Sequence, residues 1–463
     1  MKERRVKGVE TSEHQTVALP MDAIKLAIQK GNKAAMRQLL EELQPYDLGQ
    51  IFFRLNGVYR RQLLDFLSPE KIAELVEEVE KTEQLEILSA LPPEKLSRVL
   101  NRVPSDEMAD LLEGLEEQKV QTLLKKMEQA EADKVRALLD YPGDTAGGKM
   151  TTEYISVYDH YTVEEAIQYL RQEAPTAETV YYIYVIDGDD RLVGVVSLRE
   201  LLIAQPDVPV REIMYERVIS VPADMDQEEV AAILGRYDFL AIPVVDDENR
   251  LLGIITVDDI LDVLIEEAQE DIAKLSAVSR AEKEVLASPL ASARRRIPWL
   301  MLLLFIGVLT SKLVGFFEDT ISRLTALAFF MPMVAGMTGN TGTQSLALVI
   351  RGIASGELTR DKYGRFILQQ ASVGLIIGAV CSLLIVGVLY GMENDLRLGI
   401  VVGFSLLLTL LIGTIAGTVI PLLLHFLKVD PAVASGPLIT TLSDVFSLVV
   451  YFGIATLCLN FLL

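Results

Sequence analysis

The chain has only two cysteines, three histidines and one tryptophan among its 463 residues. Cys381 and Cys458 both lie inside apolar segments, so we expect neither a disulfide framework nor a cysteine zinc site. His14, His160 and His425 are scattered, and the sequence contains no nucleophile–base arrangement and no phosphate loop. We therefore expect that the protein is not an enzyme.

Two further absences concern the N-terminal part of the chain. The first twenty residues lack an apolar stretch, so we expect no cleaved signal peptide and a cytoplasmic N-terminal portion. Net positive charge is also absent there: the formal charge of the chain is −22, and from Pro298 onward eight basic residues balance eight acidic ones. The excess negative charge thus lies before Pro298. Such a portion binds nucleic acid poorly and suits divalent cations.

After a polar tail over 1–20, residues 21–145 follow a helical pattern. The phrase LSPEKI at 67–72 returns as LPPEKL at 91–96 and as VPSDEM at 103–108. Each copy has Pro or Ser at a helix start, an acid in the first turn and then apolar residues at helical spacing. The pattern predicts short helices stacked in a superhelical array. The expected core includes Ile72, Leu75, Leu88, Leu96, Leu100, Met108, Leu111 and Leu112.

Residues 146–266 alternate between strands and helices, and their pattern repeats. The segment VIDGDDRLVGVVS at 185–197 returns 59 residues later as VVDDENRLLGIIT at 244–256. Each copy predicts strand, helix, strand, polar turn, strand and helix, and the first copy has an insertion around 174–179. This duplicated phrase resembles a tandem pair of cystathionine-β-synthase (CBS) domains, an α/β regulatory module.

The segment 258–271 has seven acidic residues among its fourteen positions and no Lys or Arg. Apolar residues keep a helical stripe through it, so it predicts a helix that continues into a linker over 267–296. Like charges one turn apart disfavour an isolated helix by a few tenths of a kcal/mol per pair. A solvated acidic face is one interpretation. We favour a helix that needs bound cations to dock.

Three arginines, Arg294–Arg296, precede the first long apolar run and mark the cytoplasmic end of a membrane helix. Basic residues also cluster in the link near 351–365, which we place inside the cell, so the C-terminus falls outside. The domain 297–463 is expected to be all-α, with five spans at 297–317, 323–350, 366–391, 397–426 and 431–460.

Asp444 is the only charged residue from Pro431 to Leu463. A carboxylate near the middle of a bilayer costs several kcal/mol and normally faces a pathway or a partner. A buried Asp satisfied by neighbouring hydroxyls is the alternative, and we interpret Asp444 as a cation site. The polar stretch of the second span at 336–344 could serve helix packing or the same pathway. The expected pathway residues are Asn340, Thr341, Gln344, Thr440 and Thr441.

The order of these domains, with the phrases at 332–344 and 430–444, resembles the MgtE magnesium channels along nearly the whole chain. The resemblance implies a homodimer in the plasma membrane that takes up Mg²⁺ through a pore lined by spans two and five. Asp444 would bind Mg²⁺ in the pore, and the linker helix would act as a plug. A transporter of another divalent cation such as Co²⁺ or Mn²⁺, coupled to Na⁺ or H⁺, stays an alternative. The lone pore carboxylate argues against an anion channel.

In this family, Mg²⁺ bound among the cytosolic domains holds the closed state. Carried over by position, the implied sensor ligands are Glu74, Asp106, Asp110, the Gly148 carbonyl, Asp226, Glu228, Asp238, Asp259, Asp262, Glu267, Glu270 and Asp271. Family members also bind ATP in the CBS pair. Thr256 and Asp259 have the ribose-binding form, whereas the first copy has Ser197 and Glu200.

Overall fold

The computed structural model describes residues 20–41, 43–79, 81–175, 177–278, 288–458 and 462. Predictions for the tail over 1–19, for 279–287 of the linker, for the end of the last span and for Leu463 lie outside the described residues. The chain divides into two compact units, Met1–Leu264 and Ile265–Leu463. Each unit is described by itself.

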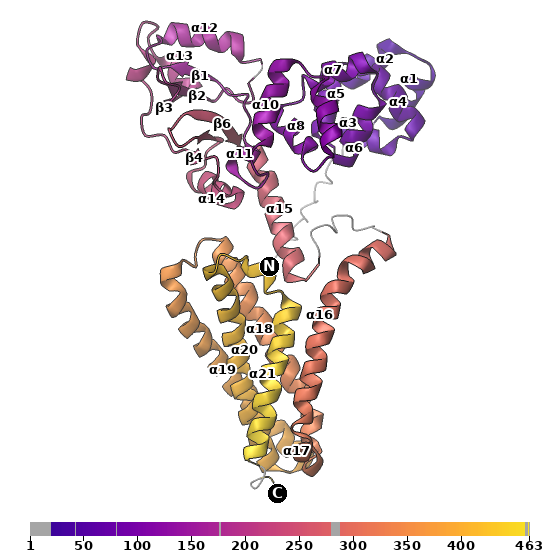
Figure 1. The fold of residues 1–463 in the computed structure, drawn as a ribbon, viewed down its shortest axis with the longest axis vertical. Coiled ribbons are helices and arrows are strands. Elements are labelled where there is room, and N and C mark those ends of the chain that lie inside the picture. The colour runs from indigo at the N-terminus through magenta and orange to yellow at the C-terminus, as the bar shows by residue number, and fades with distance from the viewer. Residues whose placement is uncertain are drawn as a thin grey trace, which may run out of the picture. The chain divides into compact units, whose positions relative to one another are not determined.

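The first unit begins with short helices (Figure 1). They are α1 (Met21–Gln29), α2 (Lys33–Glu41), α3 (Pro45–Arg54), α4 (Gly57–Phe66), α5 (Pro69–Glu77), α6 (Lys81–Ala90), α7 (Pro93–Leu100), α8 (Ser105–Leu112), α9 (Glu117–Leu124), α10 (Gln129–Leu139) and α11 (Ala146–Lys149). The three repeated phrases start α5, α7 and α8, as predicted. At α5 the Ser68 side chain accepts a hydrogen bond from the Lys71 amide. The eight predicted core residues are all buried, none more than 5% exposed.

Two three-stranded sheets follow, and both have the predicted element order. The first copy contains β1 (Ser156–Tyr158), α12 (Val163–Glu173), β2 (Tyr182–Ile186), β3 (Leu192–Ser197) and α13 (Leu198–Ile203). The turn η1 (Val210–Glu212) leads to the second copy, with β4 (Val221–Pro222), α14 (Gln227–Tyr237), β5 (Ala241–Val245), β6 (Leu251–Thr256) and α15 (Val257–Leu275). In each sheet the first pair of strands is parallel and the second pair is antiparallel. The first copy has the longer connection before its central strand, which agrees with the predicted insertion.

The two copies contact each other through matched residues. The Leu192 amide donates to the Asn249 carbonyl at 2.9 Å, and the Leu251 amide donates to the Asp190 carbonyl at 3.2 Å. Asp190 and Asn249 both have left-handed backbones, with φ of 60° and 62°. The pair is therefore related internally by an approximate twofold axis.

The second unit contains five long helices, with α16 running beside α21 at the edge of the group (Figure 1). They are α16 (Pro289–Gly315), α18 (Ala326–Ala354), α19 (Tyr363–Glu393), α20 (Leu396–Phe426) and α21 (Gly436–Leu457), joined in part by α17 (Glu318–Arg323), η2 (Arg360–Lys362) and η3 (Pro431–Val433). Among the described residues, four helical segments are long and apolar enough to cross a membrane: 289–315, 360–392, 396–426 and 436–457. Helix α18 has the length, but its polar stretch lowers its mean hydropathy.

Two helix starts differ from the predicted spans. Helix α16 begins at Pro289, N-capped by Ser288, so the three arginines lie within the helix rather than before it. Helix α21 begins only at Gly436. The side chain of Asp430 instead accepts a hydrogen bond from the Ala432 amide and starts the short turn η3. Local capping by Ser288 and Asp430 therefore accounts for both differences between the observed and the predicted helix starts.

Glycines allow α18, α20 and α21 to pack closely. A Cβ at Gly339 would lie 2.8 Å from Cγ2 of Thr440, and one at Gly342 would lie 3.0 Å from Oγ of Ser443. A Cβ at Gly417 of α20 would lie only 2.1 Å from the Gly342 carbonyl oxygen. Nothing lies within 4 Å of a Cβ at Gly336. The small-residue packing considered from the sequence is therefore present at two of the three glycines in this stretch.

We expect Gly417→Val to destabilise the membrane domain severely, because α18 and α20 would have to separate to admit the side chain. Overpacking of this kind typically costs about 1–3 kcal/mol or more. Thermal unfolding and size exclusion in detergent measure the effect. The matched control is Gly387→Val on α19, where an added Cβ meets nothing within 4 Å. Equal stability of the two variants would contradict the expectation.

Candidate ion pathway and cation-sensing clusters

Asp444 lies in the middle of α21 and is half-buried within the unit. Among the described residues, no Lys, Arg or His forms an ion pair with its carboxylate. The hydroxyl of Ser447 donates to the Asp444 backbone carbonyl at 3.0 Å, and not to the side chain. The hydroxyl of Ser443 is buried and has no hydrogen-bond partner within the part of the chain that the structure describes. The interpretation in which neighbouring hydroxyls satisfy this Asp thus has no support in the contacts.

Three threonine hydroxyls of the expected pathway donate to carbonyls one turn earlier in their own helices. These bonds join Thr341 to Met337 at 2.8 Å, Thr440 to Gly436 at 2.9 Å and Thr441 to Pro437 at 2.8 Å. A hydroxyl whose proton is committed in this way presents only acceptor lone pairs to its other neighbours. Water bound to a cation donates hydrogen bonds, so these oxygens suit a hydrated ion.

The polar side chains of α18 divide between two faces. Thr341 is buried, whereas Asn340 and Gln344, four residues apart, are both exposed. The structure therefore places Asn340 and Gln344 on an open face of α18, and Thr440 and Thr441 are half-buried on α21.

In the first unit, carboxylates gather where α8 meets the CBS pair. Burial, and then the charge of Asp259, raises the pKa of Asp106 well above its usual value. Oδ1 of Asp106 is buried, and no described residue forms a hydrogen bond with it. Burial also raises the pKa of Asp259, against the opposing effect of a hydrogen bond from the Thr256 hydroxyl at 2.5 Å. Two predicted sensor residues, far apart in sequence, thus repel each other across one cluster.

Further carboxylates that we did not predict belong to this cluster. Burial, and next the charge of Asp110, raises the pKa of Glu107 to about 7. Burial, and next the charge of Asp259, raises the pKa of Glu178 to about 7. The charge of Glu77 also raises the pKa of both residues. The i,i+3 spacing of Glu107 and Asp110 is a sequence signal that we missed, whereas nothing local marks Glu178.

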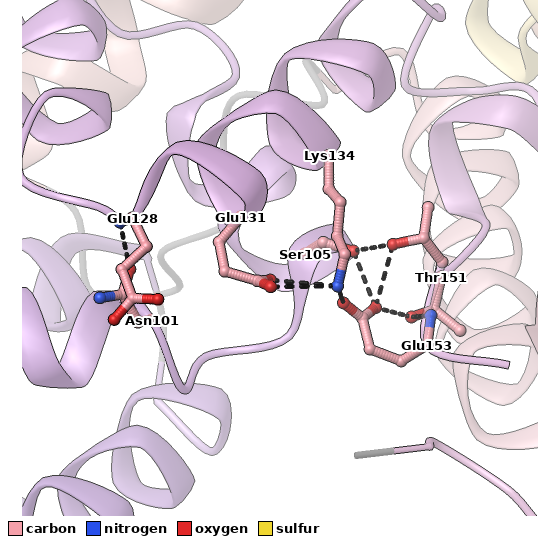
Figure 2. Close-up of polar contacts among 8 residues, drawn as sticks. Asn101, Ser105, Glu128, Glu131, Lys134, Thr151 and Glu153 are labelled. Carbon is pink, nitrogen blue, oxygen red and sulfur yellow. Dashed lines mark hydrogen bonds and ion pairs between the residues drawn. The ribbon is translucent and has the colours of Figure 1, made fainter. Parts of the chain in front are cut away.

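A polar network around Glu153 lies close to Asp106, because the charge of Glu153 adds to the raised pKa of Asp106. Figure 2 shows Glu153 with Ser105, Thr151 and Lys134 around it. Glu153 accepts hydrogen bonds from the hydroxyls of Ser105 at 2.8 Å and Thr151 at 2.6 Å. Lys134 of α10 contacts Glu153 at 3.4 Å and Glu131 at 3.2 Å. Burial alone would raise the pKa of Glu153, but these hydrogen bonds and Lys134 lower it. Glu153 therefore stays ionised and ties α8 and α10 to the CBS pair without a metal ion.

The remaining predicted sensor residues of the helical domain, Glu74 and Asp110, form ion pairs with lysines. Glu74 pairs with Lys71 at 2.5 Å, and Asp110 pairs with Lys149 at 3.1 Å. Glu74 also adds to the raised pKa of Glu77, so it lies at the edge of the cluster.

Gly148 is buried where a Cβ would lie 2.3 Å from the Pro142 carbonyl oxygen, so only glycine fits. The neighbouring Gly147 amide donates to the Ala223 carbonyl at 2.8 Å, which sets this turn against the segment leading to α14. Asp226 caps α14 and accepts a hydrogen bond from the Glu228 amide at 2.8 Å. Asp238 ends the same helix with a left-handed φ of 54°. Asp226 thus has a structural role as the N-cap of α14, and Asp238 lies at the C-terminal end of that helix.

Helix α15 is continuous from β6 through the acidic segment. Asp262 is exposed, and Glu267 is half-buried. Glu270 pairs with Lys274 at 2.5 Å. Burial, and then the charge of Asp430, raises the pKa of Asp271. The apolar stripe is open: Leu261, Leu264, Ile265 and Ile272 are 49–65% exposed.

Within the described ranges, no three His, Cys, Asp or Glu side chains converge closely enough to hold a metal ion. The carboxylates around Asp106 and Asp259 interact through their charges without forming a closed ligand set. Bringing them into ligand geometry would require a cation to offset their repulsion.

The CBS pair contains two similar hydroxyl–carboxylate pairs. Thr256 donates to Asp259 at 2.5 Å, and Ser197 donates to Glu200 at 2.9 Å. In the first copy the Glu200 side chain also accepts from the Ser197 amide, which completes a capping box. The replacement of Asp by Glu therefore preserves the local hydrogen bonding.

Comparisons with known proteins cover most of the chain. Residues 331–454 match a family model described as a divalent cation transporter, and residues 43–144 match the MgtE intracellular N domain. Residues 146–207 and 210–266 each match the CBS domain.

Relatives and solved structures agree with these matches. A magnesium transporter MgtE of Bacillus subtilis is 52% identical over 332 residues, which are 71% of this chain and 73% of the relative. The soluble part of a magnesium transporter is 37% identical with a TM-score of 0.51, covering 54% of this chain and 98% of that structure. The cytosolic domain of the Mg²⁺ channel MgtE in complex with ATP is 43% identical with a TM-score of 0.50, covering 52% and 99%. The chain belongs to the MgtE family of magnesium transporters.

Proposed function

We propose that this protein carries Mg²⁺ across the plasma membrane along α18 and α21, with Asp444 as the cation site. The observation that carries the proposal is an unpaired, half-buried carboxylate in a membrane-spanning helix, beside threonines that present acceptor oxygens. The names of the relatives favour magnesium over Co²⁺ or Mn²⁺. The three family models that match this chain describe a transporter, an intracellular domain and the CBS domain, and none of them describes an enzyme.

Mg²⁺ releases its inner-shell water reluctantly and prefers octahedral oxygen coordination. A largely hydrated ion therefore fits this site best, with Asp444 supplying charge and the oxygens of Thr440 and Thr441 accepting from bound water. A divalent ion gains more from such a site than a monovalent ion does.

Closure by cytosolic Mg²⁺ is the second part of the proposal. Asp106 and Asp259 repel each other while they are ionised, and Glu107 and Glu178 add to that repulsion. Mg²⁺ bound among them would offset it and hold the helical domain against the CBS pair. A shift from mostly open to mostly closed requires about 5 kcal/mol of differential binding, which several weak sites can supply together.

A homodimer in the lipid bilayer is supported by surfaces that one copy leaves open. No residue of α16 is buried within the unit, and the apolar stripe of α15 is exposed. Asn340 and Gln344 also face outward from α18. A second copy would cover these faces and place two Asp444 carboxylates around one pathway. The N-terminal domains are cytoplasmic in this arrangement, and the chain ends outside the cell.

ATP is proposed as a ligand of the CBS pair, with its ribose at Thr256 and Asp259. The support is the solved relative in complex with ATP and the matching hydroxyl–carboxylate pair. Mg²⁺ is both the substrate and the regulator, and nucleic acid is not a proposed partner.

Flux measurements in proteoliposomes test the proposal. The purified protein is reconstituted, and Mg²⁺ entry is followed with a trapped fluorescent indicator at several Mg²⁺ concentrations on the CBS side. We expect entry driven by the Mg²⁺ gradient alone, which stops as CBS-side Mg²⁺ rises into the millimolar range. Entry that requires a Na⁺ or H⁺ gradient would indicate a coupled transporter. A rate of entry that does not change with the CBS-side Mg²⁺ concentration would contradict the proposed sensor.

A further inference from the structure

In the second unit, the last turn of α15 rests on the connection between α20 and α21. The ammonium of Lys274 contacts Oε1 of Glu270 at 2.5 Å and also bonds Oδ2 of Asp430, a residue 156 positions away in sequence. Oδ1 of Asp430 meanwhile accepts from the Ala432 amide at 2.8 Å. Asp430 therefore holds both Lys274 and the start of η3.

Apolar packing reinforces this contact. Leu275 packs against a buried cluster that lines the start of α21 and the end of α18. A Cβ at Gly436 would lie 3.3 Å from the Leu275 carbonyl oxygen, so the backbones approach closely. The cluster consists of Leu346, Ile350, Ala432, Ala434 and Ile439.

The ion pairs are partly shielded from water. The side chains of Lys274, Glu270 and Asp430 are 30%, 11% and 36% exposed. Burial alone would lower the pKa of Lys274, but its bonds to Asp430 and Glu270 raise it to about 12. Lys274 is thus charged at every physiological pH. Along α21, Asp444 lies eight residues after Gly436, or about 12 Å at the helical rise.

We propose that Lys274 is a positioning residue for gating, whose ammonium fixes the end of α15 at the cytoplasmic entrance of the pathway. This inference rests on the proposed function, because it concerns closure of the same pathway. The ammonium bridges Glu270 and Asp430, so an ion pair within the chain supplies part of the attraction at this contact. Mg²⁺ bound by the sensor residues then acts on a helix end that Lys274 already holds.

Lys274→Met removes the charge but keeps much of the apolar stem, and it leaves Glu270 and Asp430 to repel each other. We expect the CBS-side Mg²⁺ concentration that halves flux to rise at least about threefold. Lys274→Arg should keep it near the wild-type value. Asp430→Asn should raise this concentration as much as Lys274→Met does. The double variant should raise it no further, because both substitutions remove the same interaction between Lys274 and Asp430. An unchanged or lower concentration in Lys274→Met would overturn the proposal. A lower value would mean that Mg²⁺ binds at Glu270 and Asp430 more effectively than the ammonium did.

A second measurement follows the contact without flux. Leu275→Cys and Gly436→Cys are combined in full-length protein whose native Cys381 and Cys458 are replaced by alanine, and disulfide formation is timed on monodisperse protein. We expect Lys274→Met to slow cross-linking at least about threefold, and Lys274→Arg to leave it fast. Equal cross-linking rates in all three proteins would contradict the proposal that Lys274 holds the end of α15. If the wild type shows no Mg²⁺ flux, the proposed function fails, while the cross-linking result still decides whether Lys274 holds α15.

Discussion

Asp444→Asn is expected to reduce Mg²⁺ flux at least about tenfold, a loss that corresponds to about 1.4 kcal/mol or more at the limiting site. Asparagine has nearly the same shape and keeps an acceptor oxygen, but it removes the only charge of α21. No ion pair offsets that charge among the described residues. A cation on the pathway is therefore its natural partner. Flux into proteoliposomes measures the effect.

The control for this variant makes the same chemical change outside the proposed pathway. Asp319 of α17 is 79% exposed and pairs with Arg323 at 3.2 Å. Asp319→Asn should leave flux within about twofold of wild type, since an exposed ion pair contributes little. If Asp444→Asn conducts Mg²⁺ as well as this control does, Asp444 is not the cation site.

Asp106→Asn is expected to have opposite effects with and without Mg²⁺. In the presence of a chelator, the full-length variant should unfold at a higher temperature than the wild type. The reason is that the substitution removes the carboxylate of Asp106, which is partly buried and is repelled by Asp259. With millimolar Mg²⁺, the gain in unfolding temperature should shrink, because one ligand is lost. The concentration of CBS-side Mg²⁺ that halves flux should rise at least about fivefold, the lower end of typical coupling between sites.

Asp133→Asn is the matched control for the sensor. Asp133 lies on α10 of the same helical domain, is 57% exposed and pairs with Arg136. This variant should keep the wild-type response to Mg²⁺ in both thermal unfolding and flux. A uniform loss of stability in Asp106→Asn, with an unchanged Mg²⁺ response, would show that Asp106 is structural rather than a sensor.

Local patterns predicted the elements of this fold well. Short helices at 69–77 and 93–100 follow from proline at a helix start and apolar residues at helical spacing. The matching strands at 182–186 and 241–245 follow from β-branched runs ahead of acidic turns. Where a capping side chain competes, as Asp430 does before α21, the apolar run alone gave the wrong start.

The candidate site was only partly predictable, because it depends on contacts between distant segments. The expected pathway residues could be chosen from the sequence, because each is a polar residue within an otherwise apolar span. Glu178 interacts with Asp259 only because the fold brings them together, and no periodicity relates their positions. Likewise, the ion pair between Lys274 and Asp430 joins residues that are 156 positions apart. In the sequence, Lys274 is simply a basic residue after an acidic segment, and nothing there indicates Asp430 as its partner.

The exchange of matched hydrogen bonds at Asp190 and Asn249 has a consequence for the symmetry of the CBS pair. A contact that residue i makes to residue j, and that j returns to i, is what two identical subunits form around a twofold axis. The two copies thus meet within one chain as two subunits meet in a symmetric dimer. The longer connection in the first copy places Glu178 beside Asp259, whereas the second copy has no counterpart to this insertion. The acidic cluster is accordingly asymmetric, although the pair of copies that supports it is nearly symmetric.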